Sequence, residues 1–504
     1  MINNEPQINQ RQVAVCTAFN GWLYAAYTYT DPTTHFVRLN IMKSVDNGLT
    51  WTLFINQGFI GDAKSLTSYD IIAIGDSLTN LKLVAAWVSS PSPNPQAGGG
   101  NPQVWVYGGV TGAYENYLLD VGGATCIALA NDYPYPATNS NPHSLCIIYS
   151  DRFAWAGGID SLYICTSSDG GHSISNKRVI ATSTNLIHKV DIAYGLSSTM
   201  NSGRYYAVWE EQTSWNNSVG HIFTAHSEPN FNSPFTKPVK LDSIDPSALN
   251  NARFPVIACQ YNNTDNDSSN ITEMIFFDKY IPSENRYDIA GFYNLQSTNS
   301  NHFTPFTINS TSDYRISPSV AFNPYSSKFM VTYYDSTNQK LPFLQHDFNM
   351  TNPGNWEVVS QGYNDSSNLS SPQPKVVYNP SQKQGMNVWS SEGQASNGIA
   401  MFDAQYLTTG ISSNDLQGND LKVQIYPNPC TSAFNISFCL GGSEHVTIAL
   451  YDIYGQSMGT ITDHIFSSGT HVLNNNVTGI APGAYVVKVK IGKTNKSYKL
   501  IVFD

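Results

Sequence analysis

The sequence is poor in charged residues and has no strongly basic region. Only 12% of its 504 residues are charged, and the formal net charge is -11. A protein that binds a polynucleotide needs a basic surface to meet the phosphates, and no cluster of Lys or Arg stands out before the last twenty residues. We therefore expect no nucleic-acid partner.

Long apolar runs are also missing. No stretch of eighteen or more apolar residues occurs, so we expect that the chain is not an integral membrane protein. Residues 1–5 have neither the basic start nor the apolar centre of a secretory leader. If the protein is exported, we expect its signal peptide to lie outside this numbering.

The cysteines and acids do not form a metal-binding motif. The seven cysteines include no CxxC pair and no Cys/His pattern with zinc spacing, and most lie in apolar runs where buried thiols are common. Cys430 with Cys439, or Cys146 with a neighbour, is the first disulfide to test. Asp265 and Asp267 alternate as calcium ligands do, but no Gly and no distal acid follow. We therefore expect a solvated turn at this segment and no cofactor, with a calcium site as the alternative.

The composition instead favours an all-β protein. Hydrophobic residues make up 41% of the chain, which is enough for a core, while small polar residues and Tyr suit short strands joined by turns. One unit, an alternating strand followed by a turn and a continuous apolar strand, recurs about every 56 to 65 residues, a spacing that fits four-stranded propeller blades. The copies begin near Gln12, Tyr69, Thr125, His188, Arg253, Arg315 and Pro372.

The second strands carry this interpretation. Residues 23–27, 83–87, 145–149 and 206–209 are continuous apolar runs, typical of strands that are buried on both faces. We predict a seven-bladed β-propeller over residues 1–406. Two alternatives remain open, a six-bladed sialidase-like propeller and a pair of stacked β-sandwiches.

Two turn motifs support the propeller. The first is S-x-D-x-G-x-x-W, and the second has Ile174 at the aromatic position. Ser and Asp side chains hold such a turn, and Gly supplies a positive φ. The motif residues are Ser44, Asp46, Gly48, Trp51, Ser167, Asp169 and Gly171. The pattern resembles the Asp box (BNR repeat) of sialidase-like propellers, in which it is structural and not catalytic.

The C-terminal part has a different composition. Residues 407–422 are small and polar without periodicity, which is typical of a linker. Residues 423–504 alternate apolar and polar side chains between turn clusters, which predicts a small antiparallel β-sandwich.

Four motifs occur in order within this sandwich. They contain Tyr426, Pro427, Asn428, Pro429, Asp452, Gly455, Gly483, Tyr485 and Lys499. Together they resemble a type A C-terminal sorting domain of the type IX secretion system. The resemblance implies recognition by the translocon and sorting machinery of a Bacteroidetes-type bacterium. It also implies a protein that is secreted or anchored at the outer surface of the outer membrane.

The candidate site lies on the propeller face opposite the Asp-box turns. Second-strand ends place acids there, first-strand entrances add basic residues, and long loops add aromatic rings. A binding site for a glycan or a surface protein would use Asp31, Asp151, Trp155, Glu210, Trp215, Asp278 and Glu392, with Tyr287 as a further ring. His188 lies at the entrance of the fourth repeat.

The same face offers residues for catalysis. A glycosidase needs one carboxylic acid and one base about 5 to 10 Å apart. The candidates are Glu211, Asp335, Arg253 and Arg315. Arg253 resembles the first arginine motif of sialidases, but it lies in the fifth repeat and arginines are few. We therefore expect a binding propeller, with a secreted glycoside hydrolase or lyase, or a surface-layer or filament component, as alternatives.

Overall fold

The computed structural model describes residues 13–30, 33–48, 50–57, 63–91, 99–132, 144–153, 158–196, 203–213, 219–228, 234–241, 251–261, 271–295, 302–309, 312–360, 373–392, 398–403, 423–426, 428, 430–440, 442–452, 456–491 and 494–502. These residues contain no α-helix, and therefore no helix that could cross a membrane. The chain forms two compact units, Met1–Tyr406 and Leu407–Asp504.

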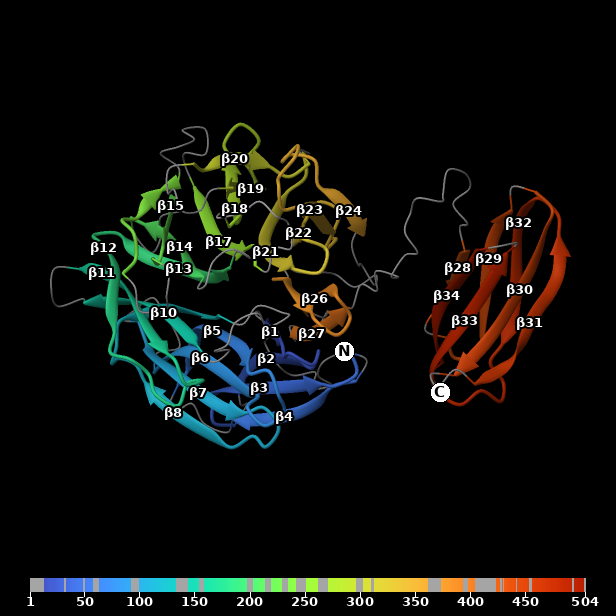
Figure 1. Cartoon of the computed structure of the whole chain (residues 1–504), viewed down its shortest axis with the longest axis horizontal. Helices are drawn as coiled ribbons and strands as arrows, with labels where there is room; N and C mark the ends of the chain where they lie inside the picture. Colours follow the sequence, from blue (N-terminus) through green and yellow to red (C-terminus); the bar gives the residue numbers. More distant parts are fainter. Residues whose placement is uncertain are drawn as a thin grey trace. The chain divides into compact units, whose positions relative to one another are not determined.

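The described residues of the first unit form antiparallel sheets in which the strands follow sequence order (Figure 1). The first three sheets are β1 (Val13–Thr17), β2 (Leu23–Thr30), β3 (Val37–Ser44) and β4 (Thr52–Gln57); β5 (Ser65–Ile74), β6 (Lys82–Ser90), β7 (Asn101–Gly108) and β8 (Tyr114–Leu118); and β9 (Ala124–Asn131), β10 (Leu145–Phe153), β11 (Ile159–Ser167) and β12 (Arg178–Ser183). The next two are β13 (Leu186–Gly195), β14 (Arg204–Gln212), β15 (Gly220–His226) and β16 (Val239–Lys240); and β17 (Ala252–Cys259), β18 (Glu273–Ile281), β19 (Arg286–Asn294) and β20 (Thr304–Thr307). The last two are β21 (Arg315–Asn323), β22 (Lys328–Asp335), β23 (Phe343–Asp347) and β24 (Glu357–Ser360); and β25 (Lys375–Asn379), β26 (Gln384–Glu392) and β27 (Gly398–Asp403).

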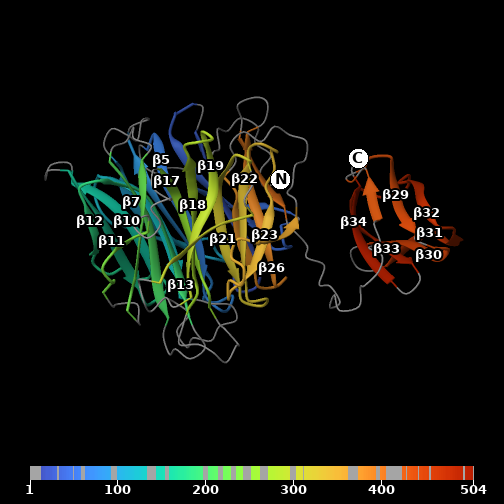
Figure 2. The ribbon, with the colours of Figure 1, turned by 90° about the horizontal axis from the view of Figure 1, so that it is seen from above.

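These sheets surround a central channel. The first strand of every sheet lines a cavity of about 290 Å³, and β1 packs against β5 on one side and β25 on the other. Outer strands such as β4, β8 and β12 lie at the periphery (Figure 1), and the strands run along the axis of the ring (Figure 2). An all-β ring of four-stranded antiparallel sheets is the organisation of a propeller.

Burial of the second strands holds the sheets together. Every residue of β14 is buried, and eight of the nine residues of β6 are buried, which includes the predicted apolar runs 206–209 and 83–87. Trp87 and Trp209 are completely inaccessible to solvent. Each large apolar side chain buried in this way contributes about 1.5–3 kcal/mol to folding. The core therefore lies between neighbouring sheets, on both faces of each second strand.

The two Ser-x-Asp turns have the same hydrogen bonds. Ser44 Oγ donates to Asp46 Oδ1 at 2.8 Å and accepts from the Gly48 amide at 2.8 Å. Ser167 Oγ repeats both bonds with Asp169 and Gly171 at 2.7 and 2.9 Å. Because this geometry depends only on side-chain oxygens and a positive-φ glycine, the second turn forms without the aromatic residue.

The seam between β25 and β1 is closed by polar contacts. Thr17 Oγ1 donates to the Tyr378 carbonyl at 2.7 Å, and Asn379 Nδ2 donates to the Gly21 carbonyl at 3.2 Å. Gly21 has a φ of 84°, and a Cβ there would lie 2.2 Å from Ser381 Oγ. A glycine is therefore required where the last sheet meets the first.

The second unit is a two-sheet sandwich. One sheet contains β28 (Val423–Tyr426), β29 (Ala433–Leu440) and β32 (Gly469–Asn476), and the other contains β31 (Ser457–Phe466), β30 (Glu444–Asp452), β33 (Gly483–Ile491) and β34 (Thr494–Val502). Phe434, Ile436, Val487 and Leu500 fill the space between the sheets. Cys430 and Cys146 are buried free thiols, so both disulfide hypotheses are wrong. Apolar burial, which favours the thiol, replaces a covalent link at both positions.

Candidate functional site

Several of the residues proposed for the rim lie outside the described part of the chain. Asp31, Trp155 and Trp215 lie outside the described residues, as do Asp265 and Asp267 of the calcium hypothesis. Glu392 ends β26, but its side chain is not described. The site is therefore built from the described residues of the sheets that begin with β13, β17 and β21.

Two of the rim acids hold the neighbouring sheet. Glu210 Oε2 accepts a hydrogen bond from the Phe254 amide at 3.0 Å, and Asp278 Oδ1 accepts one from the Ser317 amide at 2.8 Å. Phe254 and Ser317 occupy bulges at the entrances of β17 and β21 with φ of 54° and 59°. A non-glycine residue in this conformation costs about 1–3 kcal/mol, which a charge-assisted hydrogen bond of about 1.5–3 kcal/mol offsets. Both acids are 0% exposed and point into the seam between sheets.

Arg253 covers Asp278 on the outer side. Burial raises the pKa of Asp278 to about 7, against the opposing effects of the Arg253 charge and the Ser317 amide. Arg253 Nε lies 3.3 Å from Asp278 Oδ2, and its guanidinium carbon lies 3.7 Å above the Tyr287 ring. The Arg253 side chain is 27% exposed. One edge of the guanidinium is thus fixed while part of the group remains open to solvent.

His188 lies near Phe254 at the entrance of β13, and Arg253 lies 5.2 Å from the centroid of the same Phe254 ring. Nδ1 of His188 is 3.9 Å from Glu210 Oε2, its ring centroid is 6.3 Å from that of Phe254, and its side chain is 32% exposed. We call His188, Arg253, Phe254 and Tyr287 the rim patch. The sequence placed His188, Arg253 and Tyr287 on one face. Arg253 does lie over Tyr287, but Tyr287 is buried within β19.

The two acids proposed for catalysis already accept hydrogen bonds from nearby residues. Glu211 accepts hydrogen bonds from Trp209 Nε1 at 3.0 Å and from Ser183 Oγ at 2.5 Å. Asp335 accepts hydrogen bonds from the amide and the side chain of Asn338 at 3.0 and 2.8 Å. Both side chains are buried, so a substrate would have to displace these donors to reach them.

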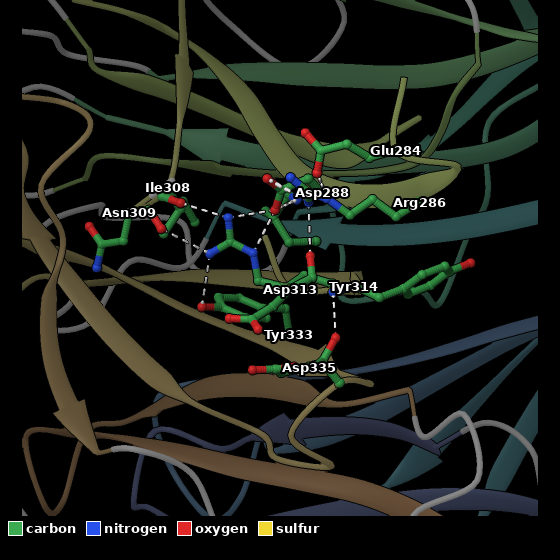
Figure 3. A network of polar contacts seen from close by, with 12 residues as sticks. Glu284, Arg286, Asp288, Ile308, Asn309, Asp313, Tyr314, Tyr333 and Asp335 are labelled. Atoms are coloured by element: carbon green, nitrogen blue, oxygen red, sulfur yellow. Dashed lines mark hydrogen bonds and ion pairs between the residues drawn. The ribbon is translucent and has the colours of Figure 1, made fainter. Parts of the chain in front are cut away.

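Arg315 is part of a buried network between two sheets. It is 1% exposed, and it donates through Nε to Asp288 Oδ1 at 2.5 Å and through Nη2 to the Ile308 carbonyl at 2.9 Å. Asp288, Ile308 and Tyr333 converge in this network, next to Arg286 (Figure 3). The sequence placed Arg315 at a solvent-facing entrance, whereas it lies inside the protein because Asp288 and the carbonyls satisfy its charge there.

A further acid cluster surrounds Asp151. Burial and the neighbouring Asp120 carboxylate raise the pKa of Asp151 to about 7, and Lys177 opposes this shift. Lys177 donates to Asp120, and its ammonium lies 4.6 Å from the Tyr163 ring centroid. Sequence patterns did not indicate Asp120 or Lys177, because both residues lie in connections outside the second strands.

The motif residues of the second unit gather around its last strand. Asn428 donates to the Lys499 carbonyl at 2.7 Å and accepts from the Ile501 amide at 2.8 Å. Gly483 pairs with Val502, and Tyr485 pairs with both Leu500 and Asp452. Tyr426 ends β28, while Pro427, Pro429 and Gly455 lie outside the described residues. Motifs far apart in sequence therefore meet at β34.

Comparison with protein families identifies this unit. Residues 424–503 match the family described as the secretion system C-terminal sorting domain. The C-terminal unit is therefore a sorting domain of the type IX secretion system, and it interacts with the machinery of that system. The protein is exported to the extracellular space or to the surface of the outer membrane. No curated protein matches the chain.

Solved structures resemble the chain at low identity. A protein of unknown function from Dyadobacter fermentans DSM 18053 has 12% identity over 66% of this chain and 93% of its own, with a TM-score of 0.41. An α-L-arabinanase from Penicillium chrysogenum has 14% identity over 78% and 92%, with a TM-score of 0.41. An α-L-arabinofuranosidase from Fusarium graminearum has 10% identity over 79% and 95%, with a TM-score of 0.40.

Proposed function

We propose that this exported protein is a seven-bladed Asp-box propeller, over residues 1–406, that binds an acidic glycan through the rim patch. Residues 407–422 are then the linker to the sorting domain at 423–504. The observation that supports binding is the state of Arg253. Its guanidinium is fixed by Asp278 and Tyr287, yet 27% of the side chain remains exposed.

A carboxylate or sulfate group suits this arrangement. A guanidinium presents N–H donors in a planar fork that matches such anions, and prior fixation lowers the entropy lost on binding. Asp278 already pairs with Arg253 at Nε, and Glu210 accepts from the Phe254 amide, so an anionic ligand would use the other N–H groups of the guanidinium. The partly exposed Phe254 and His188 rings provide an adjacent surface for a sugar ring.

The described acids favour binding over hydrolysis. Glycoside hydrolysis needs two carboxyl groups that reach the scissile bond. Glu211 and Asp335 are buried, and they accept hydrogen bonds from Trp209, Ser183 and Asn338. The proposal therefore assigns these two acids to the stability of the sheets.

The test is a glycan array that compares uronic-acid and sulfated glycans with neutral ones, using the full chain. We expect Arg253→Met to weaken binding of the acidic glycans at least tenfold, which corresponds to about 1.4 kcal/mol. Arg178→Met, at the start of outermost strand β12, is the matched control and is expected to bind like the wild type. The proposal would be overturned if Arg253→Met bound acidic glycans as tightly as the wild type, or if the protein released sugar from the glycans.

A further inference from the structure

Seven residues form one layer of the central channel. In the strand register, each of these residues lies opposite the second-strand residue that comes just before a large aromatic residue. Asp70, for example, pairs with Ala86, which precedes Trp87, and Lys375 pairs with Val388, which precedes Trp389. By the same register, the layer consists of Ala14, Asp70, Ala128, Asp191, Val256, Ser319 and Lys375. Six of the seven line a cavity of about 190 Å³. We call this set the central layer.

Three polar members of the central layer have fixed positions. Asp70 Oδ2 accepts from the Leu129 amide at 2.9 Å, and Asp191 Oδ2 accepts from the Ile257 amide at 2.9 Å. Ser319 Oγ accepts from the Val376 amide at 3.0 Å. Each bond reaches the first strand of the next sheet. The ring itself therefore holds the two carboxylates in place.

Lys375 is the exception within the central layer. No hydrogen bond or ion pair to another described residue holds its ammonium, although it lines the cavity with both acids. Burial raises the pKa of Asp70 to about 6 and also raises that of Asp191, and Lys375 is the strongest charge that opposes both shifts. Lys189 is the fourth charged group here, and burial and Lys375 lower its pKa. The Lys375 ammonium thus interacts with both acids across a gap.

A ligand group that lies between Lys375 and the two acids must both accept and donate hydrogen bonds. A sugar hydroxyl can accept from an ammonium and donate to a carboxylate at the same time. An anion would meet Asp70 and Asp191, and a cation would meet Lys375 and Lys189, so neither has a favourable place. The adjoining cavity of about 290 Å³ lies near the lower limit of ligand pockets, which suits a single sugar ring.

The adjoining cavity also has suitable walls. Tyr194, Tyr261 and Tyr378 line it together with Asn131, whereas the central layer itself is otherwise aliphatic. Aromatic side chains provide flat apolar surfaces for the C–H face of a sugar. A ring held among them can direct a hydroxyl group toward the central layer.

We infer that the central channel binds one neutral sugar residue, with the Lys375 ammonium donating to a ring hydroxyl and Asp70 and Asp191 accepting from hydroxyls. This site is separate from the rim patch and does not depend on its proposed acidic ligand. Lys375 then serves ligand binding, whereas the other polar members of the central layer both bind the ligand and contact the next sheet.

The test uses the full chain and four probes: the methyl glycosides of glucose, galactose and mannose, and glucuronate as the charged comparator. Binding is measured by calorimetry and by saturation-transfer NMR. We expect one neutral glycoside to bind and Lys375→Met to weaken it at least tenfold. Lys328→Met is the control, because Lys328 lies outside the channel in a surface ion pair with Glu357.

The outcomes separate this inference from the proposed function. Arg253→Met is expected to leave the neutral glycoside bound as in the wild type, and Lys375→Met to leave acidic glycans bound. Tryptophan fluorescence checks folding, and Lys375→Gln replaces Lys375→Met if the latter does not fold. Failure of all neutral glycosides to bind, preference for glucuronate, or an unchanged affinity in the Lys375 variant would overturn the inference.

Discussion

Replacement of Arg315 by Met tests how the sheets of the first unit are held together. Arg315 on β21 forms an ion pair with Asp288 on β19, with 2.5 Å between Nε and Oδ1. It also donates to the Ile308 carbonyl at 2.9 Å. Met matches the aliphatic stem of Arg but lacks the guanidinium, so the substitution removes the charge and the donors while keeping the apolar packing of the stem.

The magnitude follows from burial. Both side chains of the ion pair are at most 3% exposed. Removal of one partner from a buried pair costs about 3–5 kcal/mol, because the other charge stays buried. Arg286 Nη1, 3.2 Å from Asp288 Oδ2, retains part of the compensation. We therefore expect a loss of about 3 kcal/mol in the free energy of unfolding.

Urea unfolding of the full chain, followed by tryptophan fluorescence, measures this loss. All nine tryptophans precede Tyr406, so the signal reports the first unit alone. Lys328→Met is the control, and we expect it to change stability by at most about 1 kcal/mol because its partner Glu357 is exposed. A loss below about 1 kcal/mol for Arg315→Met would refute the reasoning.

Two further predictions concern pH and the turns. Burial raises the pKa of Glu273 to about 8, so its proton is held more tightly in the folded state and stability falls as pH rises from about 5 to 8. Glu273→Gln is expected to remove a decrease on the order of 4 kcal/mol, measured as the difference in unfolding free energy between pH 5 and 9. An equal decrease in unfolding free energy in the wild type and in Glu273→Gln would contradict this. For Asp169, partial burial is outweighed by hydrogen bonds from Ser173 and Ser167, and the pKa falls to about 2. Asp169→Ala and Asp46→Ala are each expected to lose about 1–2 kcal/mol in urea unfolding, because the two turns share their bonds. A large difference between the two variants would show that the turns are not equivalent.

The sequence was informative where local patterns decide the structure. Continuous apolar runs predicted buried second strands such as β6 and β14, because a strand that packs on both faces favours apolar side chains along most of its length. The motifs around Asn428 and Tyr485 predicted the sorting domain that the family comparison confirms. The Ser-x-Asp turns also formed as expected, since their hydrogen bonds join residues at most four positions apart.

The candidate site was only partly predictable. His188 and Arg253 were placed on one face as first-strand entrances and Tyr287 as a loop residue. Arg253 does lie over Tyr287, but Tyr287 is buried within β19, and His188 lies near Phe254. The count of strand ends placed Arg315 at the solvent, where the structure does not put it. A strand end gives the level of a residue along the propeller axis, but the direction of its side chain depends on the neighbouring sheet.

By itself, the sequence determined the all-β class, the strand repeat and the sorting domain, because these depend on periodicity and short motifs. Only the tertiary structure decided that Glu210 and Asp278 hold the next sheet, since their partners are backbone amides, which every non-proline residue carries. It also brought Asp70 and Lys375 into one layer. Closure of the ring sets that proximity, and no local pattern in the chain records it.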